Sequence, residues 1–356
     1  MKSRVLAILL VFVFVLGMIS TVSAQEMDPC LGLSADDCAL LQASDAADVQ
    51  SFTLNFDFNL ELNNLAAAAA MMGSADEGAP NSIAITASAS NSPIVTDPTA
   101  SDPSAAMAMA MDVNYGVSGL GAESDQSGTL SFVIADGVFY AKDPETGEWK
   151  GMTLEDAASE LSGSGVPFDP SSLLQGDTSS LNTMTDPTAA LAEAGLEPAD
   201  IEALMNVPGF VGQQRVADAE LEGQPMAAFE STVDFVPLFT SQELQSLLTK
   251  LSTASDDPNT AQIGQMGMLL PMLVKEGNVK LTRWVGVNDQ YLHRMVLEIN
   301  AAVDLAAMMG AAGGEGAGVA AEPITLKLTL DVQLNNINST TAPVAPEGAV
   351  MEEVGS

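Results

Sequence analysis

The sequence predicts an α+β fold in which helices cover the concave face of a strongly curved antiparallel sheet. At least three segments alternate apolar and polar residues over eleven or more positions, whereas ordinary strands have ~5–6 residues. Hairpin turn signals separate many of these segments, and two stretches of helical periodicity interrupt them. Because long strands accumulate twist, a sheet with one apolar face should coil around that face, which then needs a cover.

Long strands are expected at both ends of this sheet in the sequence. The first, "FTLNFDFNLEL", covers 52–62 and places Phe and Leu on one face and polar residues on the other. The last covers 324–338, with alternate apolar residues from Ile324 to Leu334. Between them we expect strands at 82–90, 106–119, 278–287 and 291–305, and a polar, Pro-rich loop at 91–104. Asp136-Gly137 and Gly223 mark two hairpin turns.

Helical segments should supply the cover. A helical insert is predicted at about 153–210, beginning with a capping box from Thr153 to Asp156. A second helical lid is predicted at about 240–277, capped by Thr240 or Ser241 and rich in Met. A short helix begins after Ser34 near the N-terminus.

The N-terminal segment predicts an exported protein. Residues 1–24 combine two basic residues, an apolar core and a small-residue "VSA" site, so we expect a signal peptide cleaved near Ala24. An uncleaved N-terminal anchor is the alternative. Residues 25–48 then form a disulfide-containing helical segment, 49–340 a single domain, and 341–356 a flexible tail. The expected location is extracellular or in a periplasm-like cell envelope.

Two cysteines support this location. Cys30 and Cys38 are the only cysteines of the chain, and a pair in an oxidising compartment is expected to form a disulfide. Two thiols with no histidine nearby make a poor metal-ligand set, so no metal site is predicted.

The charge of the chain restricts its partners. The sequence has 47 acidic and 11 basic residues and a net charge of −36, and removal of Lys2 and Arg4 with the signal would make it −38. Such a chain repels phosphate backbones, so no nucleic-acid partner is expected.

Catalytic motifs are scarce. His293 is the only histidine, and alternation places it beside Met295 on the apolar side of its strand, as a packed side chain. No nucleophile elbow, phosphate loop or dinucleotide fingerprint occurs. The low number of aromatic residues argues against a cleft that stacks sugars. A glycosidase that uses two carboxylates is still an alternative, because the pair needs to meet only in the folded protein. We therefore expect no enzyme, no catalytic residue and no cofactor.

Two predicted hairpin tips have similar sequences. Both 64–80 and 304–318 contain Ala, then Met-Met-Gly, then an acidic Gly-rich run, and each connects two long strands. Either the two tips are neighbours at one rim of the sheet, or the similarity reflects an Ala-rich composition.

Several hairpins together resemble the exported lipoprotein-carrier family with the LolA/LppX-like fold. The resembling segments are "ADGVFYAKDPETGEWK", "ADAELEGQPMAAFESTVDF" and "LTRWVGVNDQYLHRMVLEI", and the resemblance covers roughly 45–340. It implies a half-barrel whose concave face is plugged by helices, and non-catalytic carriage of a lipid or an acyl-bearing lipoprotein. The chain lacks the lipid-attachment cysteine of such proteins, which leaves membrane anchoring and any transient membrane or lipoprotein partner undefined.

We therefore predict a monomer that binds a hydrophobic ligand, a lipid or an acyl chain, in a groove between sheet and helices. The alternative is a structural cell-surface protein of the same fold without a ligand. A membrane β-barrel fits the strands but conflicts with the helical middle of the chain. The residues expected to contact the ligand are Phe52, Leu54, Phe56, Phe58, Met266, Leu269, Leu273, Leu326, Leu328 and Leu330.

Overall fold

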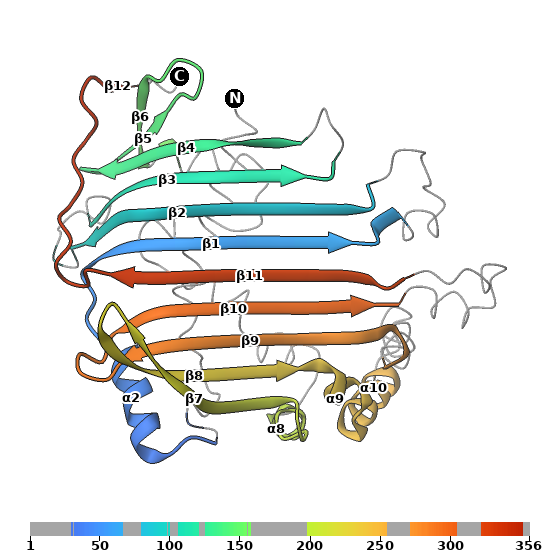
Figure 1. Ribbon diagram of the computed structural model, residues 1–356. Coiled ribbons are helices and arrows are strands. Elements are labelled where there is room, and N and C mark those ends of the chain that lie inside the picture. Colours follow the sequence, from blue (N-terminus) through green and yellow to red (C-terminus); the bar gives the residue numbers. More distant parts are fainter. Residues whose placement is uncertain are drawn as a thin grey trace.

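A computed structural model of the 356-residue chain shows an open sheet with a few helices (Figure 1). The structure describes residues 30, 32–66, 80–97, 99, 106–120, 125–154, 156–157, 198–254, 271–304 and 322–351. The expected signal peptide, most of the helical insert, and Met266 and Leu269 of the lid lie outside these residues.

Twelve strands form one sheet in the order β12-β6-β5-β4-β3-β2-β1-β11-β10-β9-β8-β7. All neighbouring pairs are antiparallel except β12 and β6. The strands are β1 (Ser51–Asn63), β2 (Ser82–Thr96), β3 (Met107–Ser118), β4 (Gln126–Ala135), β5 (Val138–Lys142), β6 (Trp149–Thr153), β7 (Val211–Leu221), β8 (Gln224–Asp234), β9 (Val274–Gly286), β10 (Leu292–Val303), β11 (Ile324–Asn335) and β12 (Val350–Met351).

Two predicted hairpin turns are confirmed. Asp136 and Gly137, between β4 and β5, both have positive φ values of 53° and 76°. Glu222 and Gly223, between β7 and β8, have positive φ values of 51° and 81°. Positive φ at both central residues gives the turn that matches the right-handed twist of two paired strands.

The predicted loop at 91–104 is wrong at its beginning, because β2 continues to Thr96. The continuation includes a bulge around Asn91, which has a φ of 54° and whose backbone N–H donates to Oδ1 of Asn55 at 2.6 Å. Beyond the bulge, Pro93 pairs with Thr53 of β1. The bulge therefore lets a Pro-containing segment stay in the sheet.

The described helices are α2 (Ala35–Asp45), α8 (Pro198–Met205), α9 (Phe235–Thr240) and α10 (Gln242–Ala254). Ser34 caps α2 by accepting a bond from the Asp37 N–H, and Ser241 Oγ accepts a bond from the Leu244 N–H at 3.1 Å. The capping box of Thr153 and Asp156 is also present. The lid prediction is wrong near 277, because β9 already begins at Val274.

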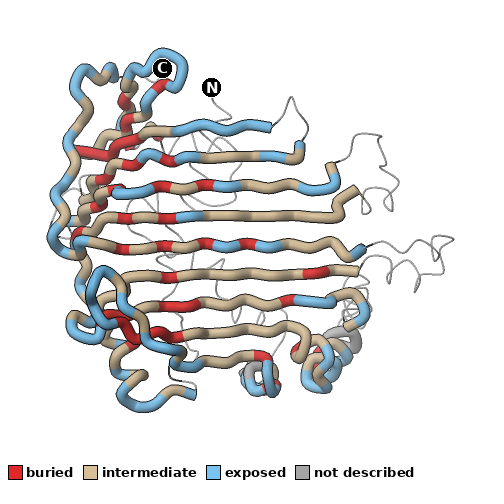
Figure 2. Tube along the Cα trace, in the orientation of Figure 1, coloured by how far each residue is buried: buried red, intermediate tan, exposed pale blue. Residues whose placement is uncertain are grey.

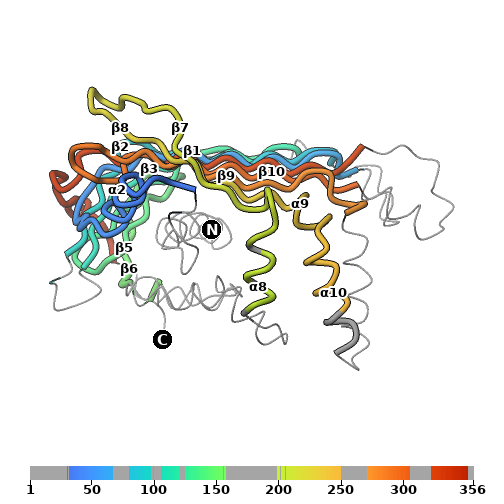
Figure 3. The backbone as a smooth tube through the Cα atoms, turned by 90° about the horizontal axis from the view of Figure 1, so that it is seen from below, coloured from blue at the N-terminus to red at the C-terminus, as the bar shows by residue number. Residues whose placement is uncertain are grey.

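All four helices lie on one side of the sheet, which we call the inner face because it carries Leu54 and Phe56. α8 and α10 extend away from the sheet on that side, and β5 and β6 turn out of the plane of the central strands toward it (Figure 3). α2 packs at one end of the inner face, where Leu41 contacts Ala227, Phe229 and Val285. α9 and α10 pack near the other end, where Phe235 and Leu244 join the cluster of Phe210 and Leu238.

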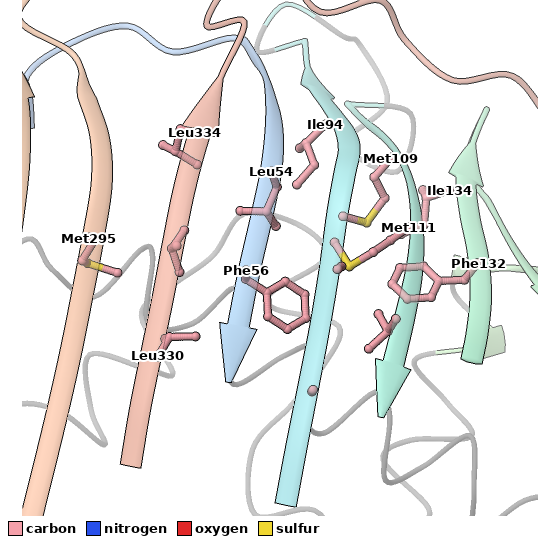
Figure 4. Close-up of a cluster of buried hydrophobic side chains, with 14 of the residues drawn as sticks. Leu54, Phe56, Ile94, Met109, Met111, Phe132, Ile134, Met295, Leu330 and Leu334 are labelled. Carbon is pink, nitrogen blue, oxygen red and sulfur yellow. The ribbon is translucent and has the colours of Figure 1, made fainter. Parts of the chain in front are cut away.

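The largest core cluster lies on the inner face of β1–β4, β10 and β11 (Figure 4). Its buried residues include the aliphatic and aromatic positions predicted from alternation, and three strands supply its centre with Phe56, Met111 and Phe132. The opposite, outer face of the central strands is polar, with Asn, Asp, Thr and Ser at the alternate positions.

The expected flexible tail, 341–356, begins with a packed segment. Ala345 and Ala349 pack against Val133 and Tyr140, and β12 pairs with β6. The segment runs past the ends of the strands to β12 (Figure 1), and its contact with Val133 lies on the outer face.

Both segments predicted as hairpin tips lie mostly outside the described residues. The strands that flank them do end together, since Asn63 pairs with Thr325 and the Asn64 side chain donates to the Pro323 carbonyl oxygen at 2.7 Å. The two tips therefore begin at the same rim of the sheet, which carries Leu62.

Candidate ligand-binding face

Strand register arranges the inner-face side chains in rows that run across the sheet. Residues paired across neighbouring strands share a face, and the next row on that face lies two residues along each strand, about 7 Å away. We name three rows after their β1 members. The Phe56 row contains Met295, Val332, Phe56, Ala89 and Val113. The Leu60 row contains Val279, Ile299, Leu328, Leu60, Ile85 and Val117. The Leu62 row contains Ala301, Leu326, Leu62 and Ile83.

Burial falls from the Phe56 row, across the intervening row of Phe58 and Leu330, to the Leu60 and Leu62 rows. Every member of the Phe56 row is buried, with 2–6 % of its surface exposed. In the Leu60 row only Leu328 is buried, and in the Leu62 row every member is partly exposed. Figure 2 shows the same gradient along the central strands, with buried residues toward one end and half-buried residues toward the rim. Among the described residues, apolar side chains therefore continue along the inner face beyond its fully buried part.

Helices pack against the inner face both at its buried end and near the rim. α2 packs over the β8–β9 part of the buried end. At the rim, Phe235 of α9 lies against Gly277, where a Cβ would meet the Phe235 Cβ at 3.4 Å. Gly277 pairs with Ala301 of the Leu62 row. The β9 end of the Leu62 row thus lies beside α9.

The structure brings seven of the ten predicted contact residues together. Leu54, Phe56, Leu328 and Leu330 are buried in the largest cluster, and Phe52, Phe58 and Leu326 pack against it while partly exposed. Leu273 is half-buried in the helical turn that precedes β9. Sequence analysis missed the contribution of Met107, Met109 and Met111, whose alternation already placed them on this face.

A buried cation lies on the inner face, beside the more exposed Arg215, which pairs with Phe229 of β8 and is 38 % exposed. Arg283 pairs with Phe229 of β8 and Met295 of β10, so it extends the Phe56 row. Its side chain is 9 % exposed, and its Nη1 contacts Oδ1 of Asp45 in α2 at 3.3 Å. Burial lowers the pKa of Arg283, an effect that Asp45 opposes, and burial also raises the pKa of Asp45. Each charge of this pair is therefore disfavoured by its surroundings.

The outer face holds its charges in better-solvated pairs. Arg294 binds Asp331 through two bonds, from Nε to Oδ1 at 3.0 Å and from Nη2 to Oδ2 at 2.6 Å, and it stacks 4.9 Å from the Trp284 ring centroid. These bonds raise the pKa of Arg294. Lys280 forms an ion pair with Glu298 on the same face. A shallow depression of about 440 Å³ lies nearby, between Asp57, Asn114 and Asp331.

His293 does not lie on the apolar side of its strand as predicted. The pairing of β10 with β9 shifts between Leu292 and Arg294, and a bulge breaks the alternation of side chains. The imidazole Nε2 instead lies 2.9 Å from Oδ2 of Asp289. Both residues line a polar cavity of about 290 Å³ with Glu222, Gln333 and Asn335.

The predicted disulfide is confirmed. Cys30 and Cys38 are bonded, with their Cα atoms 5.0 Å apart, and the bond ties the segment before α2 to its first turns. Among the residues that the structure describes, no cluster of three His, Cys, Asp or Glu side chains could hold a metal ion. In the same part of the chain, no helix is long and apolar enough to cross a membrane.

Comparisons with known proteins give similar structures but no sequence family. No family model matches the chain, and no curated protein matches it. LprF from Mycobacterium bovis is similar over 89 % of this chain and 99 % of its own, with 14 % identity and a TM-score of 0.31. The lipoprotein LppX from Mycobacterium tuberculosis is similar over 87 % of this chain and 98 % of its own, with 11 % identity and a TM-score of 0.28.

Proposed function

We propose that this protein is an exported, non-catalytic carrier that binds the apolar part of a lipid or acyl-bearing molecule against the inner face of its sheet. The fall in burial from the Phe56 row to the Leu62 row is the observation that supports this function. A row of Leu and Ile side chains left partly in water is unfavourable, because full burial would recover part of the ~1.5–3 kcal/mol that separates an exposed from a fully buried side chain. A bound acyl chain would supply that burial.

The ligand would contact the Leu60 and Leu62 rows and the partly exposed residues of the predicted site, Phe58 and Leu326. Apolar contact is the only role these residues need, because the proposed function involves no covalent step. Contiguous apolar surface that stays partly uncovered is a feature of ligand-binding grooves and interaction sites.

Lipid retention would test this function. The protein is incubated with phosphatidylcholine vesicles and re-isolated by size exclusion, and bound lipid is measured by mass spectrometry. We expect the unmodified protein to retain lipid. Leu60→Gln and Ile299→Gln place amides in the partly exposed row and should lower retention about tenfold, the factor equivalent to ~1.4 kcal/mol.

Thr329→Gln is the matched control. Thr329 pairs with Asn59 and Glu298 on the outer face, so its replacement should leave lipid retention unchanged. Absence of lipid from the unmodified protein, or equal retention by all three variants, would favour a structural protein whose inner face is filled by its own chain.

A further inference from the structure

Resting on the proposed carrier function, we propose that the ligand is an anionic amphiphile whose carboxylate or phosphate head binds Arg283. The head group would replace Asp45 as the partner of the guanidinium. The acyl chain would lie along the apolar rows of the inner face. This assigns a head-group site to one residue and restricts the ligands to those with a negative charge next to an apolar chain.

The position of Arg283 suits a head-group site. Leu281 lies two residues earlier on the same face and belongs to the largest apolar cluster, while Val285 lies two residues later and belongs to the α2 cluster. Arg283 therefore separates two apolar regions. From Leu281, paired residues lead to Leu297 of β10, and the more exposed Leu60 row begins one row further on. A chain attached to an anion at Arg283 would have continuous apolar contact from the first carbons.

The guanidinium has a buried donor, Nε, without a hydrogen-bond partner in the described part of the chain. In contrast, Arg294 makes two bonds to Asp331, and Arg215 makes bonds from Nε and both terminal nitrogens to Asp37 and Asp218. A guanidinium binds carboxylate and phosphate best through two parallel N–H bonds. Arg283 lacks this arrangement with Asp45, and an anionic head group could provide it.

The present partner of Arg283 is weak and accessible. Asp45 makes one contact of 3.3 Å, and its side chain is 46 % exposed at the C-terminal end of α2. Arg283 is therefore buried beneath a carboxylate that faces solvent. An incoming anion could displace Asp45 into water at low cost, because the displaced carboxylate regains hydration. A buried guanidinium without an anion would be unfavourable, so one anion or the other should always be present.

Binding of matched probes would test the proposal. Dodecanoate, dodecyl phosphate and the neutral dodecanoylglycerol share one chain length, and their affinities can be measured by isothermal titration calorimetry at pH about 8, where the carboxylic acid is ionised. We expect the unmodified protein to bind both anions more tightly than the neutral ester. Arg283→Gln should weaken both anions about tenfold or more and change the ester by less than about twofold, since hydrogen bonds to charged groups are the strong ones.

Asp45→Asn provides an independent readout that requires no change at the buried arginine. Removing the competing carboxylate should tighten dodecanoate several-fold while leaving the ester unchanged. A purely structural role of the Arg283–Asp45 pair would instead make this variant weaker or neutral for both probes. Arg294→Gln, on the outer face, is the matched arginine control and should change no affinity.

Each remaining outcome has one meaning. If the unmodified protein binds the ester and the anions equally and neither variant changes their ratio, the head-group assignment is overturned and the carrier function survives. If no probe binds, both fail. If acetate or inorganic phosphate competes as well as dodecanoate does, Arg283 is a small-anion site, and the proposed amphiphile is overturned.

Discussion

Ser92 is a polar residue in an apolar row. It pairs with Leu54 on the inner face, is 2 % exposed, and its Oγ has no hydrogen-bond partner among the described residues. A buried hydroxyl without a partner costs roughly 1–3 kcal/mol of stability. The bulge at Asn91 explains the position, because it shifts the face on which the following residues of β2 lie.

Replacing Ser92 by Ala should therefore stabilise the protein. Ser92→Ala removes the hydroxyl and leaves almost the same volume, so the free energy of unfolding should rise by about 1 kcal/mol. Urea denaturation followed by circular dichroism measures it. Ser88→Ala, on the outer face of the same strand, should change stability by less than about 0.5 kcal/mol. A loss of stability in Ser92→Ala would show that the hydroxyl has a partner.

Arg283 and His293 show how far single residues can be predicted from the sequence. Leu281, Arg283 and Val285 alternate in "LTRWVGV", so the apolar face of Arg283 could have been predicted from spacing alone. His293 could not, because the bulge beside it is set by pairing with β9 and leaves no mark in the sequence of β10. Its partner Asp289 lies in the adjoining turn, which only the closed hairpin brings within reach.

Strands and helices differ in how well the sequence predicts them. The alternation of apolar and polar residues in β1, β3 and β11 predicts both the strands and their apolar face. Only an extended strand places every second side chain on the same face. The C-terminal end of β2 was missed because Pro93 is unfavourable in a strand. The beginning of β9 was missed because the residues before it have a helical pattern. In both cases pairing with neighbouring strands outweighs the local preference. An apolar inner face was predicted from the excess of strand surface, whereas the fall in burial along it depends on which rows other elements reach.

α2 closes one end of the inner face through a single buried side chain. Leu41 is fully buried against Ala227, Phe229 and Val285, whereas the other side of the helix faces solvent. The disulfide holds the start of α2 and the Arg283–Asp45 contact holds its end. Loss of Leu41 should therefore loosen the whole helix rather than a local contact.

Leu41→Ala should lower the free energy of unfolding by about 2–5 kcal/mol, the usual range for a buried leucine. Urea denaturation would measure the loss, and hydrogen exchange of α2 amides would show whether the helix detaches first. Gln42→Ala, on an exposed position of the same helix, is the control and should change stability by less than about 0.5 kcal/mol. A similar loss in both variants would contradict the assigned orientation of α2.

The charge of the whole molecule opposes its folding. With 47 acidic and 11 basic residues, the folded chain concentrates negative charge that the unfolded chain spreads over a larger volume. The described ion pairs on the outer face, such as Arg294–Asp331 and Lys280–Glu298, neutralise few of these acids. The same negative field would slow the approach of an anionic ligand, which makes the local cation at Arg283 more important for binding.

Salt should therefore stabilise this protein at neutral pH. Raising NaCl from about 0.01 M to 0.1 M shortens the screening length from about 30 Å to 10 Å, which weakens repulsion across the molecule more than attraction within close pairs. We expect Tm at pH 7 to rise by about 1–3 °C, because ~1 kcal/mol shifts Tm by about 2–4 °C in a domain of roughly 150–250 residues and by less in a longer chain. Differential scanning calorimetry measures this change in Tm.

The control is the same increase in NaCl near the sequence pI of about 4.1, where the net charge is close to zero and Tm should hardly change. An equal rise at both pH values would mean that salt acts on apolar burial, and a fall at pH 7 would mean that attractive pairs outweigh the repulsion among the acids.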